Sequence, residues 1–341
     1  MRFGLAAGYW SRGVPEGQVE AIAAAEEVGF DSVWTAEAYG SDALTPLAWW
    51  GASTSKLRLG TAIMQMSART PTAAAMAAMT MDHLSGGRFI MGLGVSGPQV
   101  VEGWYGQPFP RPLERTREYI DVVRQVIARE APVTFEGKQI QLPMDGGTGL
   151  GKALKSTVHP LRTDLPIALA AEGPKNVALA AEIADAWIPF WFSPKADEFY
   201  RGCLAEGFAR DGARRTMDDF EVFAPVPVIP CDNAEDGATF VRHLMALYIG
   251  GMGASDANFH ADVFVRMGWG DVCADVNDLY RAKRKDEAAA AIPLEMVQDV
   301  ALVGPMGKIK DELEIWDTTC ISTMLVMGDG NLIRSLAKLQ S

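Results

Sequence analysis

Apolar and polar positions along the chain follow two alternating patterns. Short runs rich in apolar and β-branched residues are each followed by a longer Ala-rich stretch with apolar positions at helical spacing. The short runs predict eight strands, at residues 3–8, 31–35, 56–64, 88–95, 166–171, 185–190, 220–229 and 320–327. The longer stretches predict helices at residues 16–28, 45–54, 72–84, 114–129, 175–183, 196–211, 235–249, 304–317 and 332–339.

This alternation favours a parallel sheet, because a helix that follows each strand carries the chain back to start the next strand in the same direction. The strands are almost continuously apolar, as expected when both faces of a sheet are covered. Eight repeats favour closure into a (β/α)8 TIM barrel over the alternative, an open doubly wound sheet. We therefore predict an α/β fold in which one TIM-barrel domain spans residues 1–341.

Two insertions interrupt the pattern, at about residues 131–160 and 250–298. In the first, FEGKQIQL at 135–142 predicts a small hairpin and the Gly-rich run at 145–151 predicts a loop. The second has clusters of Gly, Trp and Asp followed by the charged helical run RAKRKDEAAAA.

Composition narrows the compartment and the partners. The four cysteines are scattered without a C-x-x-C pair, which disfavours a zinc site or a disulfide framework and favours a reducing cytoplasm. No apolar run is long enough to cross a bilayer, and the N-terminal run is too short for a signal peptide. The net charge of −12 disfavours nucleic acids and anionic membranes as partners. We expect a cytoplasmic protein that acts on a small molecule.

Reaction sites of TIM barrels lie where the strands end, so the segments 8–15, 35–44, 62–71, 95–104 and 171–176 hold the candidates. Glu37, after the second strand, is a candidate base or hydrogen-bond acceptor, with a helix cap or a solvated charge as the alternative. Trp10, Tyr39 and Trp104 are candidates to line a substrate pocket or to pack against the protein.

The segment Ala171-Glu172-Gly173-Pro174-Lys175-Asn176 begins a helix, whose free N–H groups and positive dipole end suit a phosphate; an ordinary helix start is the alternative. Arg69 is either a surface residue or a second anion contact. The run from Gly92 to Gly97 fits G-x-G-x-x-G, but it lies in the fourth unit and Pro98 follows, so a dinucleotide fingerprint is disfavoured. These glycines either allow close packing or form a shelf of small residues for a flat ring.

No histidine spacing indicates a metal site and no G-x-S-x-G motif is present, so an organic cofactor is the simplest source of the chemistry. His83 is expected to be structural. His159, His243 and His260 lie in or near the interruptions.

Three blocks, LGTAIMQMSARTP, MDHLSGGRFIMGLGVSG and ALAAEGPKNVALAAEIADAWIP, resemble the luciferase-like monooxygenase superfamily, and within it the actinobacterial coenzyme F420-dependent oxidoreductases. The resemblance covers nearly the whole chain in the right order. It implies a barrel with a long insertion near strand seven, a deazaflavin ring across the barrel mouth, and a non-prolyl cis peptide within Ala62–Met64 behind that ring. The residues that it implies at the cofactor are Glu37, Ala62, Ile63, Met64, Ser96, Gly97, Ala171, Glu172, Gly173, Pro174, Lys175 and Asn176.

The sequence departs from one branch of that family, the F420-dependent glucose-6-phosphate dehydrogenases. That branch has an Asp-His pair after strand two, where this chain has Glu37-Ala38, and an acid and an asparagine near the positions of Pro98 and Val101. Sugar-phosphate oxidation is therefore not expected, and no residue for proton transfer is carried over with the resemblance.

The resulting hypothesis is hydride transfer between C5 of coenzyme F420 and an unidentified organic substrate, with Glu37 as the only catalytic candidate. The alternatives are an FMN-dependent monooxygenase and a cofactor-binding protein without turnover. Because barrels of this family often pair, the resemblance also implies a homodimer.

Overall fold

A closed parallel barrel forms the centre of the protein, for which a computed structural model describes residues 1–10, 12–252 and 258–339. Its strands are β1 (Arg2–Gly8), β2 (Ser32–Thr35), β3 (Arg58–Thr61), β5 (Phe89–Gly94), β8 (Ile167–Ala170), β9 (Ala186–Ile188), β10 (Glu221–Pro225) and β13 (Thr323–Val326). Each strand pairs in parallel with the next, and β13 pairs with β1. The predicted TIM barrel is confirmed, and the open sheet is wrong because this last pairing closes the circle. A short strand β4 (Met64–Gln65) pairs with the end of β5.

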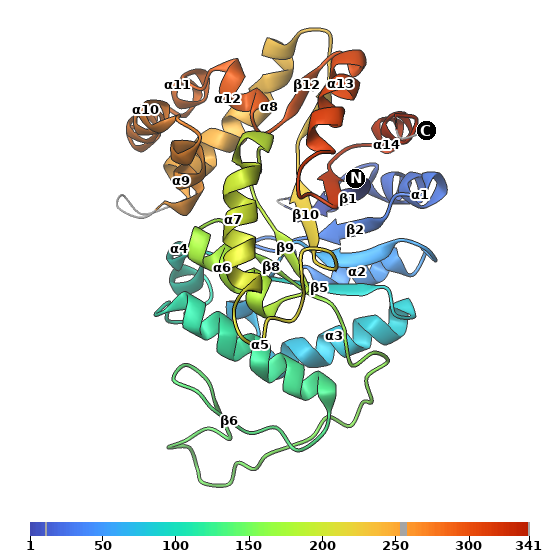
Figure 1. Cartoon of the computed structure of the whole chain (residues 1–341), viewed down its shortest axis with the longest axis vertical. Coiled ribbons are helices and arrows are strands. Elements are labelled where there is room, and N and C mark those ends of the chain that lie inside the picture. Colours follow the sequence, from blue (N-terminus) through green and yellow to red (C-terminus); the bar gives the residue numbers. More distant parts are fainter. Residues whose placement is uncertain (11, 253–257, 340–341) are drawn as a thin grey trace.

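Helices surround the barrel as the sequence predicts (Figure 1). They are α1 (Gln18–Val28), α2 (Leu44–Gly51), α3 (Pro71–Ser85), α5 (Pro112–Ala128), α6 (Pro174–Ile183), α7 (Asp197–Phe208), α8 (Ala234–Ala246), α13 (Met306–Trp316) and α14 (Gly330–Ala337). Glycine or proline lies at several of these ends, which explains why the sequence located them well: Pro71 and Pro174 begin helices, and Gly29 and Gly86 end them in the left-handed conformation.

The inside of the barrel is filled by large side chains. Trp34 packs on Phe223 with ring centroids 4.6 Å apart, and both are fully buried. Glycines in neighbouring strands make the room. A Cβ on Gly60 would lie 2.3 Å from the Trp34 ring, and a Cβ on Gly92 would lie 1.6 Å from the carbonyl oxygen of Thr61. For Gly92, the packing interpretation is therefore the right one.

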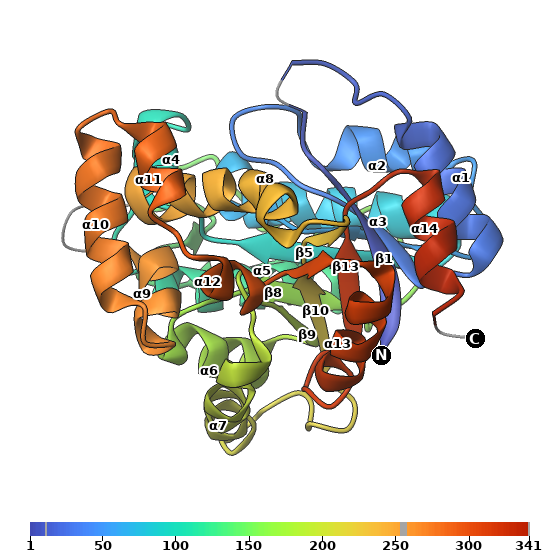
Figure 2. The ribbon, with the colours of Figure 1, turned by 90° about the horizontal axis from the view of Figure 1, so that it is seen from above.

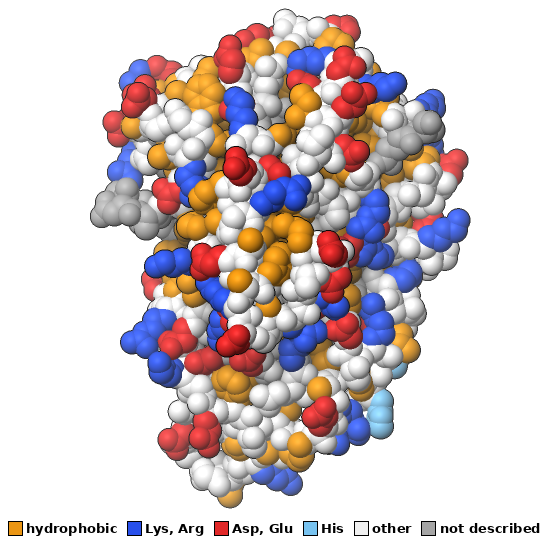
Figure 3. All heavy atoms as spheres, viewed as in Figure 1, with side chains coloured by type: hydrophobic (Ala, Val, Ile, Leu, Met, Phe, Trp, Pro, Cys, Tyr) orange, Lys and Arg blue, Asp and Glu red, His pale blue; other side chains and the backbone are white. Residues whose placement is uncertain are grey.

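The first insertion is a hairpin with a long loop, as predicted. Strands β6 (Phe135–Glu136) and β7 (Gln141–Leu142) pair in antiparallel fashion, and residues 145–151 carry no helix or strand. None of the described helices has the length and apolar character needed to cross a membrane. Acidic and basic side chains are interspersed over the face that Figure 3 shows.

The second insertion contains more structure than the sequence predicts. A single π-helical turn, η3 (Leu247–Gly251), ends α8, and the helices α9 (Phe259–Arg266), α10 (Gly270–Arg281), α11 (Lys285–Ala290) and α12 (Leu294–Gln298) follow. They gather on one side of the barrel (Figure 2) around an apolar cluster of their own. Residues 253–257 of this insertion lie outside the described part.

One predicted strand and one predicted helix need correction. The predicted strand 220–229 is two strands, β10 and β11 (Val228–Pro230), and β11 pairs outside the barrel with β12 (Leu302–Gly304). The chain therefore enters β12 before α13 begins, whereas the sequence placed a helix from residue 304. Each of these outer strands is only three residues long, too short for a periodic signal.

Candidate active site at the barrel mouth

Small side chains form a floor at the carboxyl ends of the barrel strands. Ala6, Ala62 and Ala170, from β1, from just after β3 and from β8, are half-buried and lie against the layer that contains Trp34. The peptide bond Ala62–Ile63 is cis, and a Cβ on Gly94 would lie 2.8 Å from the Ile63 side chain. Because three of the four half-buried apolar residues on this layer are alanines and the fourth is Ile63, a flat ring could approach the strand ends.

Met64 differs in burial from Ala62 and Ile63, the other two residues predicted at this part of the cofactor site. Its side chain is fully buried in the core cluster beneath the helices, so it points away from the mouth and could offer a ligand only its backbone.

Ser96 and Gly97 border the floor after β5. Ser96 adopts a left-handed conformation with φ of 59°, and Gly97 begins a short helix α4 (Pro98–Gly103) where the sequence predicts only a loop. A Cβ on Gly97 would lie 4.0 Å from the ring of Phe259, the first residue of α9. The second insertion therefore lies next to this border of the mouth.

The loop after β8 presents an uncapped helix start. Gly173 is the N-cap of α6, no side chain accepts a hydrogen bond there, and a Cβ on Gly173 would meet no atom within 4 Å. Lys175 is exposed and forms no ion pair with any described residue. Pro174 has no N–H and the Asn176 amide donates to the Gly173 carbonyl at 2.9 Å, so the Gly173 and Lys175 amides are the ones without a partner among the described residues. These two amides, the helix dipole and the Lys175 cation coincide, which suits a phosphate. Pro174 and Asn176 lie on either side of Lys175 in the sequence, whereas the side chains of Ala171 and Glu172 are buried.

Glu37 lies at the mouth, but both of its carboxylate oxygens are already bonded. Oε1 accepts from the Gln65 amide at 2.7 Å and from Arg69 at 2.5 Å, and Oε2 accepts from the Ala43 amide and from Arg69, both at 3.0 Å. Burial alone would lower the pKa of Arg69, but the hydrogen bond and the charge of Glu37 outweigh it and raise that pKa. Arg69 is therefore the partner of Glu37 and is not a free anion contact.

The three predicted aromatic residues differ in their surroundings. Trp10 packs against Trp50 with centroids 5.9 Å apart, and its indole Nε1 is buried without a partner among the described residues. Tyr39 is 51% exposed and Trp104 is 65% exposed. Trp104 therefore does not line an enclosed pocket. A partly open cavity lined by Met66, Val95 and Phe109 measures only about 10 Å³, enough for one water.

The second insertion brings two side chains to the loop after β8 that the sequence analysis missed. His260 Nδ1 lies 2.8 Å from Glu172 Oε1, and Arg266 donates to the Glu172 carbonyl at 3.1 Å. The other carboxylate oxygen of Glu172, Oε2, is buried and has no partner among the described residues. The N-cap Asn258, which accepts from the amides of His260 and Ala261, is the local signal that could have revealed helix α9.

Aromatic rings enclose His260. Its ring meets Tyr248 edge-on at 4.8 Å and Phe190 at 5.9 Å, and Phe259 lies 4.8 Å away. Burial raises the pKa of Tyr248, and the charges of Tyr9, Glu172 and Tyr39 raise it further. Tyr248 is thus within electrostatic reach of loops from both sides of the barrel.

The other histidines lie elsewhere. His83 Nε2 lies 2.7 Å from the His159 carbonyl oxygen, and His243 pairs with Asp286. Among the described residues, no group of three or more His, Cys, Asp and Glu side chains could hold a metal ion.

Comparisons with known proteins agree on one family. The sequence profile named luciferase-like monooxygenase matches residues 2–323. A Mycobacterium tuberculosis protein that carries the name of a coenzyme F420-dependent oxidoreductase is 56% identical over 342 residues, covering 99% of both chains. Two solved structures have a TM-score of 0.78 and cover 99% of this chain and 97% of their own. They are the coenzyme F420-dependent tetrahydromethanopterin reductase of Methanopyrus kandleri, 20% identical, and an F420-dependent secondary alcohol dehydrogenase with an F420-acetone adduct, 17% identical.

Proposed function

Because the chain belongs to the luciferase-like monooxygenase family, we propose that it is a coenzyme F420-dependent oxidoreductase acting on a small organic molecule. The observation that carries the proposal is the placement of a floor of small residues beside an uncapped helix start at one end of the barrel. The floor suits a flat ring and the helix start suits its phosphate. The name of the 56% identical relative supports F420 as the cofactor.

The residues present fit such a cofactor. Ala6, Ala62 and Ala170 would lie under the ring, and Ser96 and Gly97 along its side. Gly173 and Lys175 would hold the phosphate, Gly173 through space that no side chain fills and Lys175 through its charge. When bound, the deazaflavin supplies hydride transfer at C5. The protein contributes the orientation of ring and substrate, and proximity of this kind accounts for much of a rate enhancement.

We assign Glu37 a positioning role. Its carboxylate ties the loop after β2, through the Ala43 amide, to the loop after β3, through the Gln65 amide and Arg69. A carboxylate with four donors cannot also accept a proton from substrate without losing them. Glu37 therefore keeps the cis segment Ala62–Ile63 in place beneath the ring.

Fluorescence titration with F420 tests the proposal. The wild-type protein should bind F420 at micromolar concentrations, and Gly173→Ala should weaken binding about tenfold, because the added methyl group would occupy the phosphate position. The fold should tolerate this change, since φ of Gly173 is −75° and nothing lies near its Cβ position. Gly202→Ala in α7, where a Cβ also meets no atom, is the matched control.

A parallel titration with FMN separates the alternative cofactor. Tighter binding of FMN than of F420 would contradict the proposal and favour an FMN-dependent monooxygenase. Bound F420 that no donor or acceptor reduces or oxidises would favour a cofactor-binding protein without turnover.

We also propose a cytoplasmic homodimer. Trp49 on α2 and Met76 on α3 are 80% and 60% exposed, which supports burial of this surface against a second copy. Light scattering should give twice the mass of the 341-residue chain. A monomer at micromolar concentration would contradict the dimer without affecting the proposed chemistry.

A further inference from the structure

Helix α9 places a histidine and a carboxylate together at the mouth, and neither is used in the function proposed so far. The side chain of His260 is 18% exposed and that of Glu172 is 8% exposed. A carboxylate only accepts hydrogen bonds, so Nδ1 carries the hydrogen of the 2.8 Å contact. Nε2 makes no hydrogen bond to any described residue. It is therefore the ring atom that is free to gain and lose a proton.

The barrel topology places the loop that carries Glu172 opposite the loop after β1. In the closed sheet β8 lies four strands from β1 in either direction, so the loops that follow these two strands face each other across the mouth. Tyr248 responds to Glu172 in the loop after β8 and to Tyr9 in the loop after β1. The His260 ring lies 4.8 Å from the Tyr248 ring.

His260 also lies close to the segments proposed to hold the cofactor. Its neighbour Phe259 is within 4.0 Å of the Cβ position of Gly97, and its partner Glu172 directly precedes Gly173. His260 therefore borders the segments proposed to hold the cofactor.

Glu172 suits a supporting role. The carboxylate is held by Nδ1–H on one oxygen, while its second oxygen is buried without a partner among the described residues. Such a charge stabilises an imidazolium and fixes the orientation of the ring, as the carboxylate of a catalytic triad does. Glu37 cannot take this part, because both of its oxygens are occupied.

We propose that His260 is the proton-transferring residue of this enzyme, that Glu172 orients it, and that the substrate is a carbonyl compound or the corresponding alcohol. The proposal rests on the proposed F420-dependent function. In reduction, Nε2–H would give its proton to the carbonyl oxygen, and the reduced cofactor, when bound, would supply the hydride that the carbonyl carbon receives. The C=O π bond breaks, one O–H and one C–H bond form, and the carbonyl gains the two electrons that the cofactor loses.

The charges around His260 favour a neutral oxygen over an anionic group. A protonated His260 and Arg266 carry two positive charges, and an ionised Glu172 and Asp262 carry two negative ones, so no net positive charge is left to attract a carboxylate or phosphate. The raised pKa of Tyr248 keeps its hydroxyl neutral, able to donate a hydrogen bond to the same oxygen. Phe190 and Phe259 offer apolar contact for the rest of a substrate.

The test compares His260→Gln and Glu172→Gln with the control His243→Gln, which changes an exposed histidine of α8. Cyclohexanone, 2-butanone and benzaldehyde with reduced F420 serve as probes. We expect His260→Gln to lower kcat by about a hundredfold or more while the Kd for F420 stays within about threefold. Glu172→Gln should lower kcat about tenfold with the same Kd, a split that a merely structural role would not produce. His243→Gln should match the wild type.

The pH profile of kcat should lose one limb in His260→Gln. The titratable and charged groups around His260 in the described residues are Glu172, Tyr248, Tyr9, Tyr39, Asp262 and Arg266. A limb that persists in His260→Gln would belong to one of them and overturn the assignment.

A readout without turnover covers the case of a variant that misfolds. Diethyl pyrocarbonate should modify His260 in the wild-type protein, detected by mass spectrometry of the peptide. Oxidised F420 with cyclohexanone, a pair that cannot exchange a hydride, should block the modification. Absence of that protection, full activity of His260→Gln, or F420 binding without reduction of any of the three probes would each overturn the inference. Failure of the wild type to bind F420 would instead overturn the proposed function.

Discussion

Single residues at the mouth differ in how many of their polar atoms are already bonded, and this decides what they can do. Glu37 and Glu172 are both buried carboxylates in loops that follow barrel strands. Glu37 has donors on both oxygens, whereas Glu172 has a donor on only one. The first is therefore suited to hold loops together, and the second is suited to orient His260.

Replacing Glu37 tests its positioning role. Glu37→Gln should lower the free energy of unfolding by about 2 kcal/mol, because Arg69 keeps its charge without its partner. Urea denaturation measures the change, and the double variant Glu37→Gln/Arg69→Gln, which removes both charges, should recover part of it. Unchanged stability together with a hundredfold loss of kcat would make Glu37 a proton-transferring group instead.

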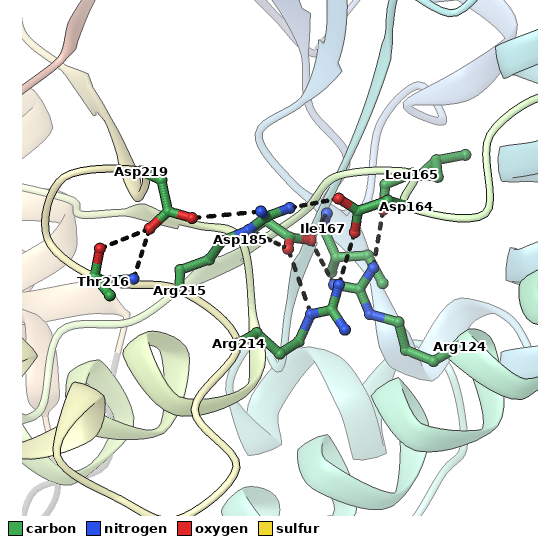
Figure 4. Close-up of polar contacts among 9 residues, drawn as sticks. All are labelled: Arg124, Asp164, Leu165, Ile167, Asp185, Arg214, Arg215, Thr216 and Asp219. Carbon is green, nitrogen blue, oxygen red and sulfur yellow. Dashed lines mark hydrogen bonds and ion pairs between the residues drawn. The ribbon is translucent and has the colours of Figure 1, made fainter.

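Elements of the barrel are joined at the end opposite the mouth by buried ion pairs. Asp185, just before β9, accepts from Arg124 of α5 at 2.5 Å, from the Ile167 amide at 2.8 Å and from Arg215 at 3.0 Å. Asp164 bridges Arg214 and Arg215 beside it (Figure 4). At this face of a barrel such a network serves stability and not catalysis.

Removing the central charge should therefore affect folding alone. Asp185→Asn should lower the free energy of unfolding by about 3 kcal/mol, because three arginines lose their common partner in a largely buried site. F420 affinity of the folded variant should stay at the wild-type value. A loss of affinity without a loss of stability would contradict the structural role.

The lowered pKa of Glu26 predicts how the stability of the protein depends on pH. Burial tends to raise the pKa of Glu26, but hydrogen bonds from the Leu57, Ser55 and Lys56 amides lower it to about 2, from an ordinary value of 4.5. A lowered pKa in the folded state means that these bonds stabilise the protein fully above pH 4.5 and are lost as the pH falls toward 2.

Thermal unfolding of Glu26→Gln checks this dependence. The melting temperature should lie below that of the wild type at pH 7, and the difference should shrink between pH 4.5 and pH 2. Because Glu26 joins α1 to the start of β3 at the protein surface, solvent screening keeps the effect small. A difference that is constant over this range would show that the hydrogen bonds do not depend on the charge.

In the whole molecule, the second insertion is a separate apolar cluster that reaches the barrel at the mouth. Its contacts to the loop after β8 come from α9, through His260 and Arg266. A ligand at the mouth should therefore order the barrel loop and α9 together.

Hydrogen exchange measures this coupling. F420 should slow amide exchange in residues 172–177 and also in 259–266, because both segments border the proposed site. The hairpin at 135–142 serves as the control, since it is bound to Glu118 of α5 and should not change. Protection confined to 172–177 would separate α9 from the cofactor.

Local sequence patterns were sufficient for the barrel. Apolar periodicity and Gly or Pro at helix ends predicted seven of the eight barrel strands and the nine helices around them to within about three residues. The prediction for the remaining strand, 220–229, merged β10 with β11. The sequence also predicted the helix start at Gly173, because a glycine followed by a proline determines the backbone of a helix start locally. Such features depend on neighbours a few residues apart.

Only the tertiary structure decided which side chains are bonded. Arg69 donates to the carboxylate of Glu37 although the two residues are 32 positions apart in the sequence, and His260 contacts Glu172 although they are 88 positions apart. The outer pair of β11 and β12 likewise joins segments far apart in sequence. No local pattern encodes these contacts, because they depend on how the closed barrel brings its loops to one end and on where the insertion packs against them. The sequence by itself therefore determined the barrel and the place of its mouth, and the folded chain determined which groups there remain free to react.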